Sequence, residues 1–350
     1  MDFLKDKHIV VTGSCGTVGS EIVRQLLEKT DANPALVVGL DNRESELFFQ
    51  DQQYLANNKA VFYLCDLRDK DSLRHHLKGA DVVFHTAALK HVVMCERSPM
   101  DAVQSNILGV QNLVDLSLEL NVGRVIFTSS DKAVNPTNVM GTSKLMGERL
   151  ITAANASSSN SSTIFCSTRF GNVLGSSGSV IPIFKAQIAK GGPVTLTDSE
   201  MTRFVMSAEE ACELVIETAI IAKGGEVFIT KMPVIRIIDL AEVMIEELSP
   251  HYGHDPNDIK IETIGVKPGE KLYEELMSDE ETRRAFELNK FFCVEPAFKG
   301  FFSSIEYASS LASYKPVSNP YNSSVEKPIS KLWPALFRWS NCFVRGSRFV

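Results

Sequence analysis

The chain has little of what nucleic-acid-binding, membrane-spanning or disulfide-stabilised proteins require. Its 36 lysines and arginines are outnumbered by 43 aspartates and glutamates, giving a net charge of −7, and no basic stripe interrupts this excess. Such a balance argues against a nucleic-acid partner. No apolar run approaches the ~20 residues of a membrane-spanning helix, so we expect no membrane span. The seven cysteines form no C-x-x-C pair, which indicates reduced thiols, and we expect no metal site.

The N-terminus also lacks the features of a targeting segment. Residues 1–7 are too charged and too few for a signal peptide, and they lead directly into an apolar run at 8–12. We therefore expect a cytoplasmic protein. Its 350 residues, 44% of them hydrophobic, suffice for one large α/β domain or one and a half domains.

In the first half, apolar runs of strand length alternate with helical patterns. The predicted strands are 8–12, 35–40, 60–64, 82–85, 124–129 and 162–169, and the predicted helices are 17–29, 44–57, 70–77, 100–120 and 139–154. Such alternation is typical of a parallel sheet covered by helices on both faces. We predict an α/β fold, a Rossmann-type doubly wound parallel sheet with a smaller C-terminal substrate-binding lobe.

The second half is interrupted by glycine and proline, for example at Gly191-Gly192-Pro193. This suits a smaller lobe packed over the carboxyl ends of the strands, where open α/β sheets bind ligands. We expect residues 1–170 to form the core and 171–300 to form a mixed lobe interleaved with it. Residues 301–350 are predicted to be an irregular appendix, with a short amphipathic helix at 329–339.

A glycine-rich loop follows the first predicted strand and opens the first predicted helix. Glycines spaced as G-x-x-G-x-x-G let the backbone turn sharply and approach a pyrophosphate, while the helix N-terminus supplies N–H groups and positive potential. Because strand and helix flank this motif, we interpret it as a dinucleotide site rather than a plain tight turn. This makes 1–170 an NAD(P)-binding core. The predicted contacts are Gly13, Ser14, Gly16, Thr17, Val18 and Gly19.

Asp41, at the end of the second predicted strand, suits the adenosine ribose hydroxyls. Its carboxylate would repel a 2′-phosphate and so favours NAD, whereas Arg43 could reverse the preference by pairing with that phosphate. A plainer alternative is that Asp41 caps the next helix.

Further cofactor contacts are predicted after the third and fourth strands. Asp66, with Leu67 beside it, could meet the adenine amino group, although residues 65–68 could equally form a structural turn with an aspartate cap. Ala87 and Ala88 are small enough to let a cofactor lie close. Asn106, in a predicted helix, either braces the active-site strand or is a satisfied core amide.

Residues 128–144 have the layout of a dehydrogenase catalytic segment, with a hydroxyl at the strand end and then a Y-x-x-x-K pair. Here, however, the pair reads Met140-x-x-x-Lys144, and a thioether cannot give or take a proton. Either the site is inactive, or its acid–base chemistry has moved to neighbours, of which Asp131 and Lys132 are the obvious candidates.

The segment SSDKAVNPTNVMGTSK at 129–144 resembles the signature of the CapD-type, or polysaccharide biosynthesis protein, branch of the extended short-chain dehydrogenases. That branch comprises UDP-N-acetylglucosamine 4,6-dehydratases and close relatives. Four more stretches agree with it: FHTAALKHV at 84–92, RFGNVLGSSGSVIP at 169–182, TDSEMTRF at 197–204 and KPGEKLYEEL at 267–276. The resemblance covers residues ~8 to ~295 in the family's order. Members carry either Tyr or Met in the Y-x-x-x-K position. Many of the Met type have an N-terminal membrane region, which is absent from this sequence.

The resemblance implies a reaction that oxidises C4 of a UDP-sugar, eliminates water across C5–C6 and returns the same hydride to C6. The cofactor, NAD or alternatively NADP, would stay tightly bound and be recycled. The sequence Asp41-Asn42-Arg43-Glu44 is closer to that of NAD-binding members. The predicted catalytic residues are Ser130, Asp131, Lys132, Met140 and Lys144. Homo-oligomers are expected from the resemblance alone.

Each of these residues has an implied role. Ser130 would hydrogen-bond the C4 oxygen, and Lys144 would bind the nicotinamide ribose. Lys132 would be the base at C5 and Asp131 the acid at the C6 hydroxyl, and Met140 would be an apolar wall. The alternative is that Asp131 and Lys132 form a surface ion pair.

The UDP-sugar would need donors for its diphosphate and a slot for uracil. The candidates are Lys90, Asn172, Arg203, Lys267 and Glu270, with Glu274 as a further possibility, and Arg203 suits bidentate phosphate recognition best. Two other functions stay open. One is a UDP-sugar 4-epimerase on the same scaffold, and the other is a non-catalytic nucleotide-binding protein.

Overall fold

The computed structural model describes residues 2–29, 32–157, 162–176, 180–265, 269–298, 305, 307 and 315–330. The chain divides into two compact units. The first unit comprises Met1–Phe170, Glu209–Lys231 and Leu276–Pro320, and the second comprises Gly171–Ala208, Met232–Glu275 and Tyr321–Val350. No helix in the described part is both long and apolar enough to cross a lipid bilayer.

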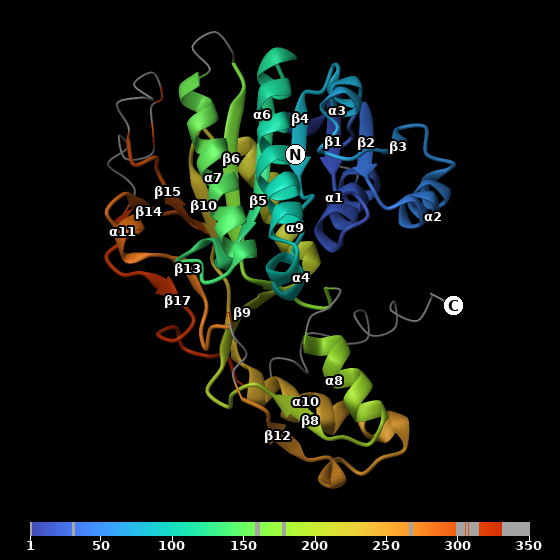
Figure 1. The fold of residues 1–350 in the computed structure, drawn as a ribbon, viewed down its shortest axis with the longest axis vertical. Coiled ribbons are helices and arrows are strands. Elements are labelled where there is room, and N and C mark those ends of the chain that lie inside the picture. The colour runs from blue at the N-terminus through green and yellow to red at the C-terminus, as the bar shows by residue number, and fades with distance from the viewer. Residues whose placement is uncertain are drawn as a thin grey trace. The chain divides into compact units, whose positions relative to one another are not determined.

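A ten-stranded sheet forms the centre of the first unit (Figure 1). Its order is β16-β14-β15-β10-β6-β5-β4-β1-β2-β3. Seven strands run parallel: β1 (His8–Thr12), β2 (Leu36–Asp41), β3 (Ala60–Leu64), β4 (Val82–His85), β5 (Arg124–Ser130), β6 (Ile164–Phe170) and β10 (Val227–Thr230). The others, β14 (Ala285–Glu287), β15 (Phe291–Val294) and β16 (Lys315–Pro316), pair antiparallel. The predicted doubly wound parallel sheet is confirmed, and the strand order reverses between β1 and β4, where such sheets bind ligands.

Helices cover both faces of this sheet. The bounds of the helices that follow β1 to β4 are α1 (Thr17–Glu28), α2 (Glu44–Tyr54), α3 (Lys70–Leu77), α4 (Val92–Arg97), α5 (Pro99–Ala102) and α6 (Gly109–Glu119). Later come α7 (Val139–Ser157), α9 (Ala208–Ile221) and the short α11 (Asp279–Thr282). Apolar side chains of α3, α6 and α7 pack on one face, among them Leu73, Leu113 and Ile151. On the other face α1 contacts α9, since Gln25 donates to the Glu209 carbonyl at 2.9 Å.

The predicted helix over 100–120 is not regular, and α4 was not predicted at all. Residues Val103–Leu108 form a π-helical segment between α5 and α6. Such segments are rare and often lie at functional sites. This one carries the buried Asn106.

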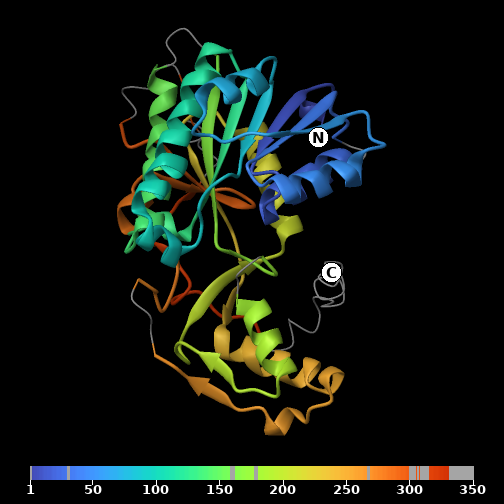
Figure 2. The same cartoon turned by 45° about the vertical axis from the view of Figure 1, so that its right-hand side comes forward.

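In its described residues, the second unit is a smaller assembly of short strands with two α-helices, α8 and α10. One sheet has the order β11-β9-β7, from β7 (Asn172–Val173), β9 (Thr202–Met206) and β11 (Val234–Arg236). β8 (Val194–Leu196) pairs parallel with β12 (Ile261–Thr263). Its core lies between α8 (Val180–Ala189) and α10 (Ile237–Leu248), with Phe184, Ile188 and Met244 almost fully buried. β13 (Glu275–Met277) and β17 (Tyr321–Asn322) are two further short strands. Figure 2 shows the same elements from another side.

The second half is interleaved with the first, and only part of 171–298 lies in the second unit. Residues 209–231 and 276–298 lie in the first unit, because β10, β14 and β15 extend the central sheet. The appendix is also not wholly irregular, since β16 adds to that sheet and β17 lies in the second unit. Of the helix predicted at 329–339, only Ile329 and Ser330 are described, and neither is helical. The remainder, 331–339, lies outside the described residues.

Candidate active site

The glycine loop after β1 is shaped for the close approach of another backbone or a ligand. Gly13 has a φ of +70°, which favours glycine, and a Cβ there would lie 2.7 Å from the backbone of Ala87. A Cβ on Gly19 would lie 2.1 Å from the Gly13 carbonyl oxygen. Helix α1 begins after Gly16, where no side chain caps its first turn, so the N–H groups of that described turn remain suited to phosphate.

Ser14 serves the loop itself. Its side chain is fully buried, its hydroxyl donates to Gln50 Oε1 at 2.9 Å, and Gln50 donates to the Ser14 carbonyl at 2.8 Å. Thr17 and Val18 lie in the first turn of α1, next to Gly16. The cofactor contacts of all these residues stay predictions, but the loop they form fits a pyrophosphate.

Asp41 is buried at the end of β2 and joins the glycine loop to the residue that precedes α2. Its carboxylate accepts from the Cys15 N–H at 3.0 Å and the Arg43 N–H at 3.1 Å, and Arg43 Nε lies 3.2 Å away. Asp41 is not the N-cap of α2; that residue is Arg43. Burial and the nearby Asp41 charge raise the pKa of Cys15 to about 11, so this thiol stays protonated at neutral pH.

Asp66 forms a turn with Arg68, which was the structural alternative for residues 65–68. The Arg68 side chain donates to both carboxylate oxygens at 2.6–3.1 Å, and this pairing lowers the pKa of Asp66 to about 2. The N-cap of α3 is Asp69, not Asp66. Leu67 packs closely against Gly109 of α6, where an added Cβ would lie 3.1 Å from the Cβ of Leu67.

Asn106 ties the segment after β4 to α7. Its Oδ1 accepts from the Leu89 N–H at 2.8 Å, and its Nδ2 donates to the Leu89 carbonyl and to Ser143 Oγ, both at 2.9 Å. Ser143 in turn donates to the Met140 carbonyl at 2.7 Å. Asn106 therefore braces the helix that carries Met140 and Lys144, rather than the active-site strand.

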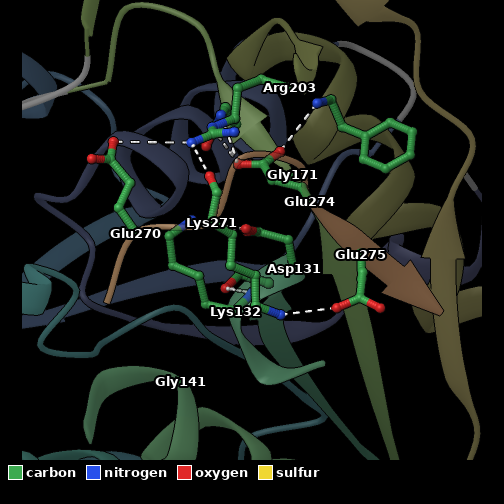
Figure 3. A network of polar contacts seen from close by, with 12 residues as sticks. Asp131, Lys132, Gly141, Gly171, Arg203, Glu270, Lys271, Glu274 and Glu275 are labelled. Atoms are coloured by element: carbon green, nitrogen blue, oxygen red, sulfur yellow. Dashed lines mark hydrogen bonds and ion pairs between the residues drawn. The ribbon is translucent and has the colours of Figure 1, made fainter. Parts of the chain in front are cut away.

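The predicted acid and base form an ion pair directly after β5 (Figure 3). Lys132 Nζ lies 3.1 and 2.9 Å from the two oxygens of Asp131, whose side chain is almost fully buried. The side chain of Lys132 is 35% exposed. Ser130 Oγ accepts the Lys132 N–H at 3.2 Å, so the hydroxyl and the pair belong to one tight turn. The alternative, a surface ion pair, therefore fits only in part, because Asp131 is buried while Lys132 is partly exposed.

Lys144 is buried on α7 against β5. Its Nζ donates to the Thr128 carbonyl at 3.0 Å and lies 4.8 Å from the Phe127 ring centre. Burial lowers the pKa of Lys144 to about 8, against the opposing effect of Glu148. A lysine with this pKa changes charge near neutral pH, as functional lysines often do.

Met140 lies in a small apolar cluster with Cys95 and Ala102, and Val92 and Val139 pack against it. Only 3% of the residue is exposed. A role as an apolar wall toward a ligand stays a prediction.

The predicted sugar-nucleotide residues fall in both units. In the first unit, burial and the charge of Arg43 lower the pKa of Lys90. Ala87 and Ala88, the predicted cofactor contacts, lie between the end of β4 and Lys90. Lys267 lies outside the described residues.

In the second unit, Arg203 and Glu274 form the centre of a polar network (Figure 3). Arg203 Nε lies 3.3 Å from Glu274 Oε1, which also accepts from Asn172 Nδ2 at 3.0 Å. The two Nη atoms of Arg203 donate to the carbonyls of Thr202, Leu272 and Lys271 at 2.7–3.1 Å. Arg203 therefore organises the 270–274 segment, and Glu270 lies 4.0 Å from its Nη2. Glu274, only a secondary candidate in the sequence, is the residue that joins Asn172 to Arg203.

Three charged residues of the first unit were not predicted to matter: Glu148, Arg169 and Glu281. Each is buried, and Arg169 forms ion pairs with both glutamates. An arginine inside the apolar run of β6 was the available signal, because charges are almost never buried without partners. Within the described segments, no three His, Cys, Asp or Glu side chains lie together as a metal-binding group would.

The chain is similar in sequence to a family of known proteins. A model of the family described as "Polysaccharide biosynthesis protein" matches residues 9–296. An uncharacterized membrane protein of Methanocaldococcus jannaschii is 50% identical over 84% of this chain and 87% of its own length. UDP-N-acetylglucosamine 4,6-dehydratase (inverting) of Campylobacter jejuni is 35% identical over 84% of each chain. UDP-glucose 4-epimerase of Rickettsia akari is 36% identical over 82% of each chain.

Among solved structures, the X-ray structure of Pen from Bacillus thuringiensis has a TM-score of 0.86 at 40% identity and covers 99% of this chain and 100% of Pen. The predicted resemblance is confirmed: the chain belongs to the polysaccharide biosynthesis protein family of CapD-like extended short-chain dehydrogenases, whose relatives include nucleotide-sugar dehydratases and epimerases.

Proposed function

We propose that this protein is a nucleotide-sugar 4,6-dehydratase acting on UDP-N-acetylglucosamine or a close UDP-N-acetylhexosamine, for surface polysaccharide or modified-sugar biosynthesis. The single observation that carries the proposal is the Asp131–Lys132 pair, which lies in one turn with Ser130 directly after β5, the strand whose Thr128 carbonyl accepts from Lys144. The similarity to the Campylobacter jejuni enzyme named for this reaction supports it.

NAD suits the glycine loop. The loop has the tight turn and the close packing that dinucleotide-binding loops need, because a Cβ at Gly13 would meet the backbone of Ala87 and a Cβ at Gly19 would meet the Gly13 carbonyl. When bound, NAD supplies a hydride acceptor for C4 and a hydride donor for C6. Asp41 would accept from the ribose hydroxyls and disfavour a 2′-phosphate. Arg43, already paired with Asp41, is poorly available to that phosphate.

The Asp131–Lys132 pair has the protons that elimination needs. Transfer of one proton along the 2.9 Å contact converts the ion pair into a neutral amine and a carboxylic acid. Lys132 then takes the C5 proton, and Asp131 gives its proton to the C6 oxygen, which leaves as water. These two transfers return the pair to its charged form.

The remaining transfers close the cycle. Lys132 returns its proton to C5 when C6 receives the hydride. At the oxidation of C4, the hydroxyl proton would leave to solvent past Ser130. At the end of the turnover, the pair would take one proton from solvent in place of the one that Asp131 gave to water, so the pair ends as it began. Ser130, the hydroxyl next to Asp131, would hold the C4 oxygen. No phenol at position 140 is needed for this balance.

The sugar nucleotide would be held by residues of the second unit. Asn172 presents an amide whose Nδ2 is oriented by Glu274, and the 270–274 segment is held by Arg203. We assign Asn172 and Glu270, together with Lys90 and Lys267, to the UDP-sugar, and give Arg203 the role of holding the segment that carries Glu270. Assembly as a homo-oligomer also stays a prediction, which light scattering would test.

The test is to incubate the purified protein with UDP-N-acetylglucosamine and follow the product by mass spectrometry. Loss of one water, ~18 mass units, is the expected outcome of the elimination. An isomer of unchanged mass would instead support the epimerase, which the 36% identity to the Rickettsia akari enzyme keeps as the second candidate. Binding of NAD and UDP-sugar with no reaction would indicate a non-catalytic nucleotide-binding protein.

A further inference from the structure

A buried arginine in the first unit uses every one of its hydrogen-bond donors. Arg169 on β6 is 1% exposed. Its Nε and Nη2 donate to the two oxygens of Glu148 at 2.7 and 2.6 Å. Its Nη2 and Nη1 donate to the two oxygens of Glu281 at 2.8 and 2.9 Å, and Nη1 also donates to the Leu276 carbonyl at 3.1 Å. A guanidinium has five N–H groups, so this one is saturated.

The charges of this triad do not cancel by themselves. Two carboxylates face one guanidinium, which leaves one negative charge inside the first unit. The Arg169 charge lowers the pKa of Glu281 to about 2, despite burial, and the two carboxylates raise the pKa of Arg169. An uncompensated buried charge is costly, so the triad calls for a nearby cation.

Lys144 is in position to be that cation. It lies one helical turn before Glu148 on α7, and i,i+4 side chains lie on the same helix face. Both are buried against the central sheet. The electrostatic effect of Glu148 opposes the lowering of the Lys144 pKa by burial. Arg284 is a further cation whose charge acts on Glu281, whereas Lys144 is the cation whose charge interacts with Glu148.

The helix that carries both residues has little freedom to move. A Cβ on Gly147 would lie 2.7 Å from the tip of the Phe127 ring, so α7 touches β5 closely between Lys144 and Glu148. The bidentate pairing of Glu148 with Arg169 then fixes α7 along β6. A shift of α7 would change the distance from Lys144 to the Thr128 carbonyl.

We propose that Glu148, held by Arg169, is a positioning residue for Lys144: it fixes α7 on the sheet and supplies the buried negative charge that keeps Lys144 protonated. The inference rests on the proposed function only in that a charged Lys144 is the form that would bind the nicotinamide ribose. The other groups around Lys144 do not supply this charge. His85 is neutral because burial lowers its pKa to about 3, and Asp131, in the turn packed on α7, is already paired with Lys132.

The test measures the titration of Lys144 directly, without cofactor or substrate. The full-length protein is labelled with ¹³C at lysine Cε, and the Lys144 resonance is identified by its loss in Lys144→Arg. In Glu148→Gln we expect the Lys144 midpoint to fall by about one pH unit, the order of shift that a nearby charge produces. In Glu281→Gln, which removes a carboxylate from the same arginine but not from beside Lys144, we expect a much smaller shift. Equal shifts in both variants, or none in Glu148→Gln, would overturn the proposal.

A second variant covers the case in which Glu148→Gln does not fold. Glu148→Leu, Arg169→Met and Glu281→Leu together remove all three charges, and buried ion triads replaced by apolar side chains often still fold. We expect the Lys144 midpoint to fall in this triple variant too, and an unchanged midpoint would contradict the role of Glu148.

NAD binding by fluorescence at pH 8 is the second readout. We expect about fivefold weaker binding in Glu148→Gln, because a midpoint one pH unit below about 8 lowers the charged fraction of Lys144 at pH 8 from about one half to about one eleventh. Glu281→Gln should bind as the wild type does. A shifted midpoint in a protein that binds no NAD would refute the proposed function of the site and leave the Glu148–Lys144 coupling intact.

Discussion

The ammonium of Lys144 lies 4.8 Å from the centre of the Phe127 ring, which in turn stacks with His85 at a centroid distance of 5.6 Å. A charged amine is attracted to an aromatic face, and the aromatic surroundings also exclude water from it. Thr128 supplies the hydrogen-bonded carbonyl on the same strand. Lys144 is thus held in a buried place where its charge is sensitive to pH.

The first prediction concerns that charge. The pKa of Lys144 is lowered to about 8, so the ammonium form is lost as pH rises through 8. We expect NAD affinity to be constant below pH 7 and to weaken above pH 8. Lys144→Arg keeps its charge over this range and should show no such loss, so a loss of equal size in that variant would contradict the assignment.

The lowered pKa of Lys144 also predicts that stability rises with pH, whereas NAD affinity falls. Unfolded lysine titrates near its ordinary pKa, so between pH 8 and that value only the unfolded chain binds this proton. Lys144 therefore destabilises the folded protein below pH 8, and this cost disappears as pH rises. The free energy of unfolding of the wild type, measured with urea, should increase relative to Lys144→Met between pH 8 and 10.

The second prediction tests the proposed acid and base. Lys132→Met and Asp131→Asn should each reduce dehydration by a factor of ~10² to 10⁴, the usual contribution of a positioned proton-transfer group. NAD binding should persist, because neither side chain is assigned to the cofactor. Lys70→Met, which removes a lysine from an exposed ion pair with Asp115, is the matched control and should retain activity. Full dehydration by Lys132→Met would remove Lys132 as the C5 base.

The third prediction concerns the position where a tyrosine was expected. Met140 is 3% exposed and packs with Cys95 and Ala102, so Met140→Tyr would add volume and a hydroxyl to a filled apolar cluster. We expect a loss of ~1–3 kcal/mol in the free energy of unfolding and no gain in activity. Met140→Leu conserves volume and should cost less than about 1.5 kcal/mol. A more active Met140→Tyr would show that the site still uses a phenol.

The fourth prediction concerns the glycine loop. A Cβ on Gly19 would lie 2.1 Å from the Gly13 carbonyl oxygen, so Gly19→Ala must displace the loop. We expect NAD binding to be lost, by fluorescence titration, in a protein whose circular dichroism is unchanged. Gly253→Asn is the control, because a Cβ there meets nothing within 4 Å and asparagine tolerates the φ of +75°.

The fifth prediction concerns acid stability. Because the Arg169 charge lowers the pKa of Glu281 to about 2, its carboxylate stabilises the folded protein above pH 4.5, and this contribution is lost as pH falls from 4.5 to 2. At pH 7 we expect Glu281→Gln to lose roughly 3 kcal/mol in the free energy of unfolding, the equivalent of the fall in the Glu281 pKa from 4.5 to about 2. Its deficit relative to the wild type should shrink as pH is lowered toward 2; a constant deficit would show that its cause is packing rather than charge.

Local patterns in the sequence determined much of the fold and the residue types of the candidate site. The first five strands were predicted to within one residue at each end, because each is an apolar run bounded by polar or glycine-rich turns. The glycine loop, Asp41 and the Ser130–Lys144 segment are contiguous motifs whose chemistry depends on residues near one another in the chain.

The tertiary structure alone decided the contacts between distant segments. β15 joins the central sheet by pairing with β10, which lies far away in the chain, and β14 and β16 are added to the sheet through β15 and β14, so no local pattern could assign them to the first unit. Arg203 looked like a free phosphate ligand until its donors were found on the carbonyls of 271 and 272. Glu148, Arg169 and Glu281 lie on three separate elements, and only the fold gathers their charges around one guanidinium, since burial and pairing are properties of the folded chain.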